Sequence, residues 1–235
     1  MKSIAIFGAG PALGLSTARR FGREGFAVDV VGRRPETVDS LVVSLRGDGI
    51  DVHGTVADLA DGALATDALA TITDRRGQLP NVVVYSPGDV SRLPVGVGEL
   101  TSRTLAEWLP LNLTTPLDLI HELLPGFAER GSGTVVVAQG TAARVPSPAL
   151  TSVGVAQSAL LNYLLAVGAE FRAAGVRITS LQIGKLIERS AAAQLFATGH
   201  FDDVEPNSLP TVDPDHLADL IWQADRGTAV EELVA

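Results

Sequence analysis

The sequence predicts an α/β fold in one domain: a doubly wound parallel sheet with helices on both faces. Three observations predict it. Short apolar runs rich in branched residues alternate with amphipathic stretches of helical length along the whole chain. These runs are apolar throughout, which is typical of strands buried on both sides of a parallel sheet. A glycine-rich turn separates the first run from the first helical stretch.

Composition limits the number of domains and the classes of partner. The chain has 235 residues, 46% of them hydrophobic and 19% charged, so we expect a single domain over 1–235. The formal net charge of −9 argues against nucleic acid or a membrane surface as partners. Cysteine is absent, which excludes disulfides and thiolate metal sites, and no metal site is expected. No signal peptide or membrane-spanning run is recognised, so a cytoplasmic protein is expected.

The opening unit predicts a site for a dinucleotide. A strand over 2–7 and a helix over 15–24 flank a turn that contains Gly8, Gly10, Pro11, Leu13 and Gly14. This strand–turn–helix order points free backbone N–H groups and the positive end of a helix dipole at an anion, usually a pyrophosphate. We therefore expect a Rossmann-type fold with a dinucleotide at this turn; a tight turn without a ligand is the alternative.

The residues after the second strand favour one cofactor. This strand is expected over 27–31, and it is followed by Gly32, Arg33 and Arg34. An acid about 20 residues past the glycines binds the ribose 2′-hydroxyl of NAD, whereas an arginine accommodates the 2′-phosphate of NADP. Two arginines and no carboxylate occur here. NADP is therefore expected rather than NAD, with Arg33 and Arg34 as its ligands; solvated loop arginines are the alternative.

The remaining elements follow the same two periodicities. Further strands are expected at 51–56, 81–85, 134–138 and 176–183, with a closing strand within 227–235. Helices are expected at 36–46, 61–75, 100–108, 111–130 and 152–173, and a last one has Asp213 as N-cap and Pro214 at its first position. The irregular segment 189–210 follows the last core strand, which makes it a candidate substrate lid or a surface excursion.

Several motifs are similar to those of one family. The turn F-G-A-G-P-A-L-G at 7–14 is similar to T-G-x-x-x-G-x-G, with Ala12 at the middle glycine. Tyr85-Ser86-Pro87-Gly88 stands where the family has N-N-A-G. Leu111-Asn112-Leu113 matches the helix that carries the active-site asparagine, and Ile183-Gly184 matches P-G with Ile183 at the proline. On these motifs the sequence resembles the short-chain dehydrogenase/reductase family, as an atypical member.

The resemblance implies where the cofactor lies. Asp58 matches the acidic residue that the family places near the adenine ring, with Leu59 beside it. Further cofactor contacts are expected from Ser86, Gly88, Gln157 and Gly184. Lys185 follows Gly184 at the rim of the same crevice, where it would reach a cofactor phosphate or a substrate carboxylate; an ordinary surface lysine is the alternative.

The same resemblance implies a degenerate catalytic set. The family uses a serine, a tyrosine acid, a lysine four residues after the tyrosine, and an asparagine. Sequence anchors at 133–137, 158–160 and 169–171 fix the register without a gap and place Gly140, Val153 and Gln157 at the serine, tyrosine and lysine positions. Glycine and valine donate no proton, and glutamine carries no charge. Asn112 is then the one catalytic residue retained.

Three hypotheses follow from these residues. The first is an NADP(H)-binding protein that has lost the family's usual carbonyl reduction. The second is an active NADP-dependent reductase whose proton comes from the substrate, from water held by Asn112 and Gln157, or from Lys185. The third is a redox-state sensor or oligomeric partner. The resemblance implies a homodimer or homotetramer formed through the helices at 111–130 and 152–173.

Overall fold

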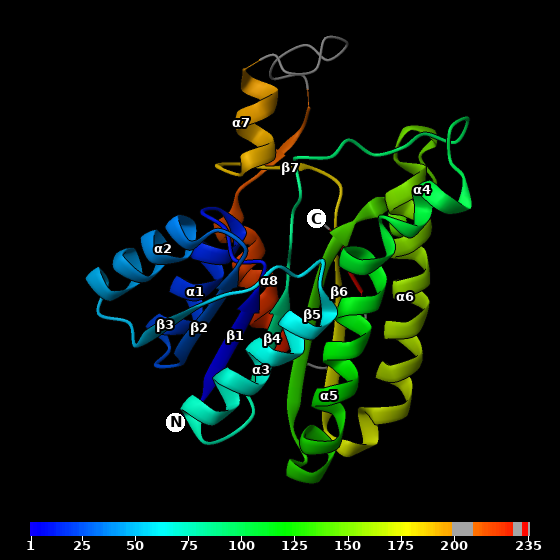
Figure 1. Ribbon diagram of the computed structural model, residues 1–235. Coiled ribbons are helices and arrows are strands. Elements are labelled where there is room, and N and C mark those ends of the chain that lie inside the picture. Colours follow the sequence, from blue (N-terminus) through cyan, green and yellow to red (C-terminus); the bar gives the residue numbers. More distant parts are fainter. Residues whose placement is uncertain (199–208, 228–231, 235) are drawn as a thin grey trace.

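A parallel β-sheet runs through the middle of the molecule (Figure 1). The computed structural model describes residues 1–198, 209–227 and 232–234. Within these residues the main sheet has seven strands in the order β3-β2-β1-β4-β5-β6-β9, and every neighbouring pair is parallel. The strands are β1 (Ser3–Phe7), β2 (Ala27–Gly32), β3 (Val52–Val56), β4 (Val82–Tyr85), β5 (Gly133–Gly140), β6 (Val176–Ile183) and β9 (Glu232–Val234).

Helices cover both faces of this sheet, which confirms the predicted doubly wound α/β architecture (Figure 1). One face carries α1 (Leu13–Arg23), α2 (Pro35–Gly47) and α8 (Pro214–Arg226). The other carries α3 (Gly62–Arg76), α5 (Thr115–Arg130) and α6 (Thr151–Phe171). The central strands are apolar on both sides because each side packs against helices.

Aromatic rings fix the last helix against the first. Trp222 of α8 meets Phe21 of α1 edge-to-face, with ring centroids 5.0 Å apart, and Phe26 lies 5.9 Å from the same indole. Such offset aromatic contacts stabilise a core beyond the burial of apolar area alone. They hold α8 beside α1, next to the glycine turn that opens the chain.

The helix ends confirm the predicted cap at Asp213 and show a further one at Asp61, which was expected inside its helix. Asp61 accepts hydrogen bonds from the N–H groups of Ala63 and Leu64 at the start of α3. Asp213 accepts from the N–H of Asp215 at the start of α8. Gly25, just past α1, has φ +80°, a conformation that glycine adopts without steric cost.

The structure differs from the sequence prediction between the fourth and fifth strands. The helix expected over 100–108 is wrong in length, because only α4 (Ser102–Ala106) forms. Pro110 has no N–H to donate, and the chain makes a π-helical turn, η1 (Pro110–Thr114), before α5 begins. Three 3₁₀ turns also occur, at η2 (Thr141–Ala143), η3 (Pro148–Leu150) and η4 (Arg172–Ala174).

A small second sheet follows the last core strand. Strand β7 (Leu186–Ile187) pairs in parallel with β8 (Thr211–Val212), and α7 (Ala191–Ala197) stands between them in the chain. In Figure 1, α7 stands apart from the main sheet, beyond the upper ends of the strands. The predicted lid at 189–210 therefore contains a helix and begins beside a strand, while residues 199–208 lie outside the described part.

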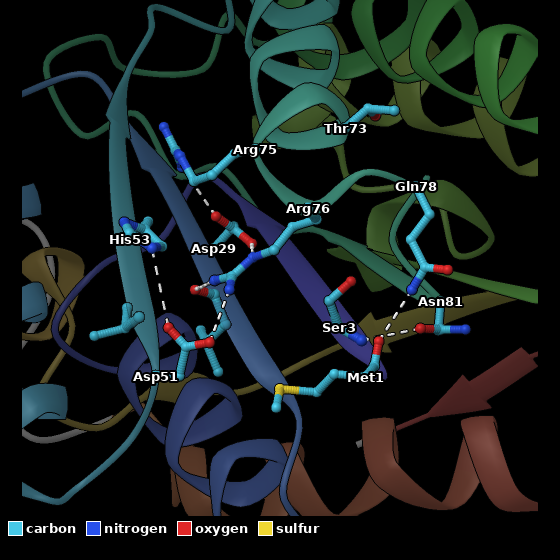
Figure 2. Close-up of polar contacts among 12 residues, drawn as sticks. Met1, Ser3, Asp29, Asp51, His53, Thr73, Arg75, Arg76, Gln78 and Asn81 are labelled. Atoms are coloured by element: carbon cyan, nitrogen blue, oxygen red, sulfur yellow. Dashed lines mark hydrogen bonds and ion pairs between the residues drawn. The ribbon is translucent and has the colours of Figure 1, made fainter.

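A buried carboxylate ties the second strand to α3 (Figure 2). Asp29 is fully buried in β2, and its two oxygens accept from Arg75 at 3.0 Å and from Arg76 at 2.8 Å. Arg76 also binds Asp51 at 2.8 Å and the carbonyl of Val28 at 3.1 Å. Because the charge of Asp29 is neutralised by two hydrogen-bonded guanidinium groups, it is tolerated inside the fold.

Candidate cofactor and active-site cavity

A cavity of about 430 Å³ lies at the carboxyl ends of the central strands. Its wall begins at the turn after β1, continues through the segments after β2, β3 and β4, and ends at β5, α6 and the segment after β6. The chain reverses its winding direction between β1 and β4, which are neighbours in the sheet. Ligands of doubly wound proteins bind in the crevice at this switch point.

The first turn has the shape that a bound anion requires. Gly8 has φ +84°, and a Cβ at this position would overlap Pro87. A Cβ on Gly14 would lie 2.7 Å from the Cα of Ala9, whereas Gly10 faces open space. Helix α1 begins here without a side-chain cap and without an acidic residue in its first turn. The N–H of Leu15 donates to the carbonyl of Gly10 at 3.0 Å, whereas those of Leu13 and Gly14 have no acceptor among the described residues and are available to a ligand.

An ion pair crosses the end of the cavity beside β2. Arg33 donates to Asp89 at 3.4 Å, and Asp89 also accepts from the N–H of Ser91 at 3.0 Å. Burial by itself raises the pKa of Asp89, but the hydrogen bonds from Ser91 and the charge of Arg33 hold it below its ordinary value. Arg34 lines the same end, and Asp58 accepts from the N–H of Ala60 at 3.0 Å.

A series of amide hydrogen bonds closes the end of the cavity beside β5 and α6. Gln157 of α6 accepts from the N–H of Gly140 at 3.0 Å and donates through Nε2 to Oδ1 of Asn112 at 3.2 Å. Asn112 lies in the π-helical turn, and its Nδ2 donates to the carbonyl of Trp108 at 3.0 Å. A Cβ on Gly140 would lie 3.3 Å from Oε1 of Gln157, so the glycine leaves room for the amide.

Tyr85 lies in the hydrophobic core, and Tyr163 packs against it. Tyr85 is buried at the end of β4, and its hydroxyl donates to the carbonyl of Leu111 at 2.8 Å. Burial raises the pKa of Tyr85. Tyr163 packs on the α5–α6 side of the core, where burial and the charge of Asp118 raise its pKa. Neither tyrosine lines the cavity.

The structure gathers most of the predicted cofactor residues around this one cavity. Two are exceptions: Asn112 reaches it only through Gln157, and Gly184 does not line it although Ile183 and Lys185 do. Lys185 is exposed. The predicted residues that line the wall are Gly8, Gly10, Pro11, Leu13, Gly14, Arg33, Arg34, Asp58, Leu59, Ser86, Gly88, Gln157 and Lys185.

Sequence reasoning missed several lining residues. Asp89 follows Gly88 directly, but nothing in the sequence pairs it with Arg33, which lies 56 residues earlier. Gln139, at the end of β5, is buried and donates to Ser180 at 2.9 Å, and it also lines the cavity. The start of α7 adds a further group to the wall, namely Ser190, Ala191 and Ala192.

A sequence profile for short chain dehydrogenases matches residues 2–194, most of the chain. The protein is a member of the short chain dehydrogenase family. "Serine 3-dehydrogenase" of Agrobacterium fabrum is 29% identical over 226 residues, which cover 94% of this chain and 86% of that protein. Human "Dehydrogenase/reductase SDR family member 4" is 27% identical over 184 residues, 78% of this chain, but the match spans just under two thirds, 65%, of the human protein.

Solved structures of the family share the fold. Actinorhodin polyketide ketoreductase with NADPH superposes with a TM-score of 0.83 at 22% identity, covering 100% of this chain and 95% of that one. NAD⁺-bound xylitol dehydrogenase gives 0.85 at 15% identity, with 99% and 96% covered. An NADPH-bound oxidoreductase from Pseudomonas aeruginosa, described as containing an atypical catalytic center, gives 0.79 at 21% identity, with 99% and 95% covered.

Family membership implies a nicotinamide cofactor, and the residues present fit one. The family binds both NADPH and NAD⁺, as the related structures show. In this chain the open space beside Gly10 and the uncapped first turn of α1 match a pyrophosphate, because both supply N–H groups without a competing carboxylate. The cofactor would supply or accept the hydride, and the protein would supply binding and orientation.

Metal ligation and membrane crossing are two further properties that the described residues bear on. No group of three or more histidine, aspartate or glutamate side chains in 1–198, 209–227 and 232–234 is placed to hold a metal ion. One segment, Pro148–Ala174, is long and apolar enough to cross a membrane by length and composition, contrary to the expectation of no such run. It contains α6, which packs on the sheet, and the core helix of a soluble protein meets the same criterion.

Proposed function

We propose that this protein binds NADP(H) and has lost the family's usual carbonyl reduction. In the proposed register, Gly140, Val153 and Gln157 replace the serine, tyrosine and lysine of the family. The amide chain carries the proposal: Gln157 bonds to the N–H of Gly140 at 3.0 Å and to Asn112 at 3.2 Å. An uncharged carboxamide therefore occupies the position where the family has a lysine to assist a proton donor.

The chemistry at this end follows from the groups present. A general acid needs a proton that it releases near neutral pH, and neither a carboxamide nor a backbone N–H provides one. Both tyrosines are held in the core, where burial raises their pKa values. Asn112 and Gln157 would orient a ligand by hydrogen bonds without transferring a proton. Hydride transfer to an ordinary ketone would then lack a protein acid.

The cofactor proposed is NADP rather than NAD. Arg33 and Arg34 lie at the wall of the cavity beyond β2, and β2 ends in Gly32 rather than in an acid. The Arg33 side chain is 49% exposed, and its guanidinium donates to Asp89 at 3.4 Å, a long contact that a phosphate would replace with a stronger one. A 2′-phosphate would gain two guanidinium partners at this position.

One observation favours a second candidate, an active reductase with an unusual proton source. Gln157 and Asn112 are hydrogen-bonded to each other beside the cavity, and among the described residues each amide has one N–H left that would donate to a water molecule. Lys185 lines the same cavity and carries an ionisable group. Loss of a protein acid costs roughly 10²–10⁴-fold in rate rather than all activity.

The proposal also covers the oligomeric state of the protein and its location in the cell. Helix α6 lies in the apolar segment Pro148–Ala174, and only 39% of the most apolar window of that segment is buried within one chain. We propose that α5 and α6 pair with a second copy, giving a homodimer or homotetramer in the cytoplasm. A sensor or partner role would then require that NADP(H) change the oligomeric state, which light scattering measures directly.

The test compares binding with turnover in one preparation. We expect saturating NADPH to raise the melting temperature by mass action. With the same protein, a broad panel of aldehydes and ketones is expected to leave the nicotinamide absorbance unchanged. Loss of that absorbance with any carbonyl, abolished by Asn112→Ala or Lys185→Ala, would establish the second candidate instead.

A further inference from the structure

We infer that the end of the cavity formed by Gln157 and Lys185 binds a small molecule with a carboxylate group. The inference rests on the proposed function, because it takes the remainder of the cavity as the cofactor's place. The carboxylate ligand would lie beside the nicotinamide. Two groups carry the inference: a cation without a counter-ion among the described residues, and an amide whose orientation is fixed.

Lys185 follows the strand that borders the Gln157 side of the cavity. It lies two residues after β6, which is the third strand from β1 in the order β1-β4-β5-β6. With neighbouring strands about 4.8 Å apart, the ends of β1 and β6 are separated by roughly 14 Å. Gly8 and the start of α1 follow β1, on the other side of the cavity. Ile183, two residues before Lys185, is the register partner of Gly140, whose N–H binds Gln157.

Lys185 also has no carboxylate partner. Among residues 1–198, 209–227 and 232–234, no acidic side chain lies within ion-pair distance of its ammonium group. The two acidic residues of the wall, Asp58 and Asp89, follow β3 and β4, and Asp89 is occupied by Arg33. In a chain of net charge −9, an unpaired cation in a cavity favours a ligand that brings the negative charge.

The Gln157 amide supplies a neutral donor at the same end. Its Oε1 accepts from the N–H of Gly140, so a flipped amide would set two donors against each other. The orientation is therefore fixed, with Nε2 toward Asn112. One Nε2 hydrogen binds Asn112, and the other has no acceptor among the described residues. An amide N–H and an ammonium group together match the two oxygens of a carboxylate.

The experiment titrates the NADPH-saturated protein by calorimetry with pyruvate, 2-oxobutyrate and phenylpyruvate, and with their methyl esters. We expect at least one acid to bind more tightly than its ester. Lys185→Gln should weaken acid binding by roughly 10- to 100-fold, the usual effect of losing a hydrogen bond to a charged group. Acid binding should fall by more than ester binding does, and the NADPH affinity of the variant is measured in the same preparation. Gln157→Glu keeps the acceptor for Gly140 but should also weaken acid binding by repulsion.

The chain offers a matched control in its only other lysine. Lys2 precedes β1, so it lies at the amino ends of the strands, whereas the cavity lies at their carboxyl ends. Its ammonium is 5.8 Å from the centre of the Phe26 ring. Lys2→Gln makes the same change in net charge and should leave acid binding at the wild-type level.

Four results would overturn the inference. Acids that bind no more tightly than their esters, with NADPH binding intact, would contradict it and leave the proposed function standing. A Lys185→Gln variant that weakens NADPH instead of the acids would assign the lysine to a cofactor phosphate. Equal losses in Lys2→Gln and Lys185→Gln would show a general charge effect. Failure of the wild-type protein to bind NADPH would contradict the proposed function itself, and the inference with it.

Discussion

Gln157 and Gly140 form a matched pair: the glutamine carbonyl accepts the glycine N–H at 3.0 Å, and a Cβ on the glycine would lie 3.3 Å from that same oxygen. That spacing is tighter than most Cβ contacts, so a side chain at 140 and the amide at 157 compete for the same space. In the proposed register, the loss of the family's serine and the replacement of its lysine would therefore be a single structural change.

This pairing predicts how reductase activity returns. Gly140→Ser alone should displace Gln157 without creating an acid, and turnover of ketones should stay at background. The triple variant Gly140→Ser, Val153→Tyr, Gln157→Lys should gain roughly 10²–10⁴-fold in NADPH oxidation, the usual contribution of general acid catalysis. The measurement is the decay of nicotinamide absorbance. A triple variant that folds, binds NADPH and remains inactive would show that the register is wrong.

The glycine turn predicts that two similar substitutions act differently. Gly8→Ala places a side chain at φ +84° and against Pro87, so it should lower the free energy of unfolding by about 1–3 kcal/mol. Gly10→Ala enters open space, so it should leave stability unchanged but weaken NADPH binding by filling the site of the pyrophosphate. Urea denaturation and calorimetry separate the two. Equal NADPH affinity in Gly10→Ala and wild type would show that the pyrophosphate does not bind beside Gly10.

Asp29 predicts a large effect on stability that does not extend to binding. Asp29→Asn leaves Arg75 and Arg76 without the buried carboxylate that both contact. Removing one partner of such a buried pair costs about 3–5 kcal/mol. Arg75→Ala, which leaves the Arg76 contact in place, should cost less because Arg75 is more exposed. Denaturant midpoints test this order, and NADPH affinity of the folded variants should stay at the wild-type value.

Asp89 predicts a pH dependence at the acid end. Its pKa is lowered in the folded protein, because the hydrogen bonds from Ser91 and the Arg33 charge outweigh the effect of burial. A lowered carboxyl pKa contributes stability above its unfolded value of about 3.9, and this contribution is lost as the pH falls through the folded pKa. The difference in stability between wild type and Asp89→Asn should be constant near neutral pH, shrink as the pH falls below about 4, and disappear below the folded pKa. A difference that persists in acid would contradict the ion pair.

Local patterns were sufficient to predict the fold. Runs of branched residues predict the central strands, and Asp213 predicts the start of the last helix through the chemistry of capping. The helix at 100–108 was overestimated because apolar spacing persists through the π-helical turn at Pro110, where the backbone pattern changes. The two-residue strands β7 and β8 are too short for any periodicity.

The sequence predicted which residues line the cavity but not which of them contact one another. The glycine turn and the two arginines after β2 line the cavity as their place in the βαβ unit requires. The pairing of Arg33 with Asp89 and the bridge from Gln157 to Asn112 join residues 56 and 45 positions apart. Such contacts depend on how strands and helices are packed, which no local sequence pattern specifies.

Calorimetric titration with NADPH and with NADH, on the wild-type protein and on Arg33→Ala, tests the central claim most directly. The account predicts that NADPH binds more tightly than NADH to the wild type and that Arg33→Ala loses most of this preference while retaining NADH affinity. Equal or tighter binding of NADH to the wild type, or no binding of either cofactor, would contradict it.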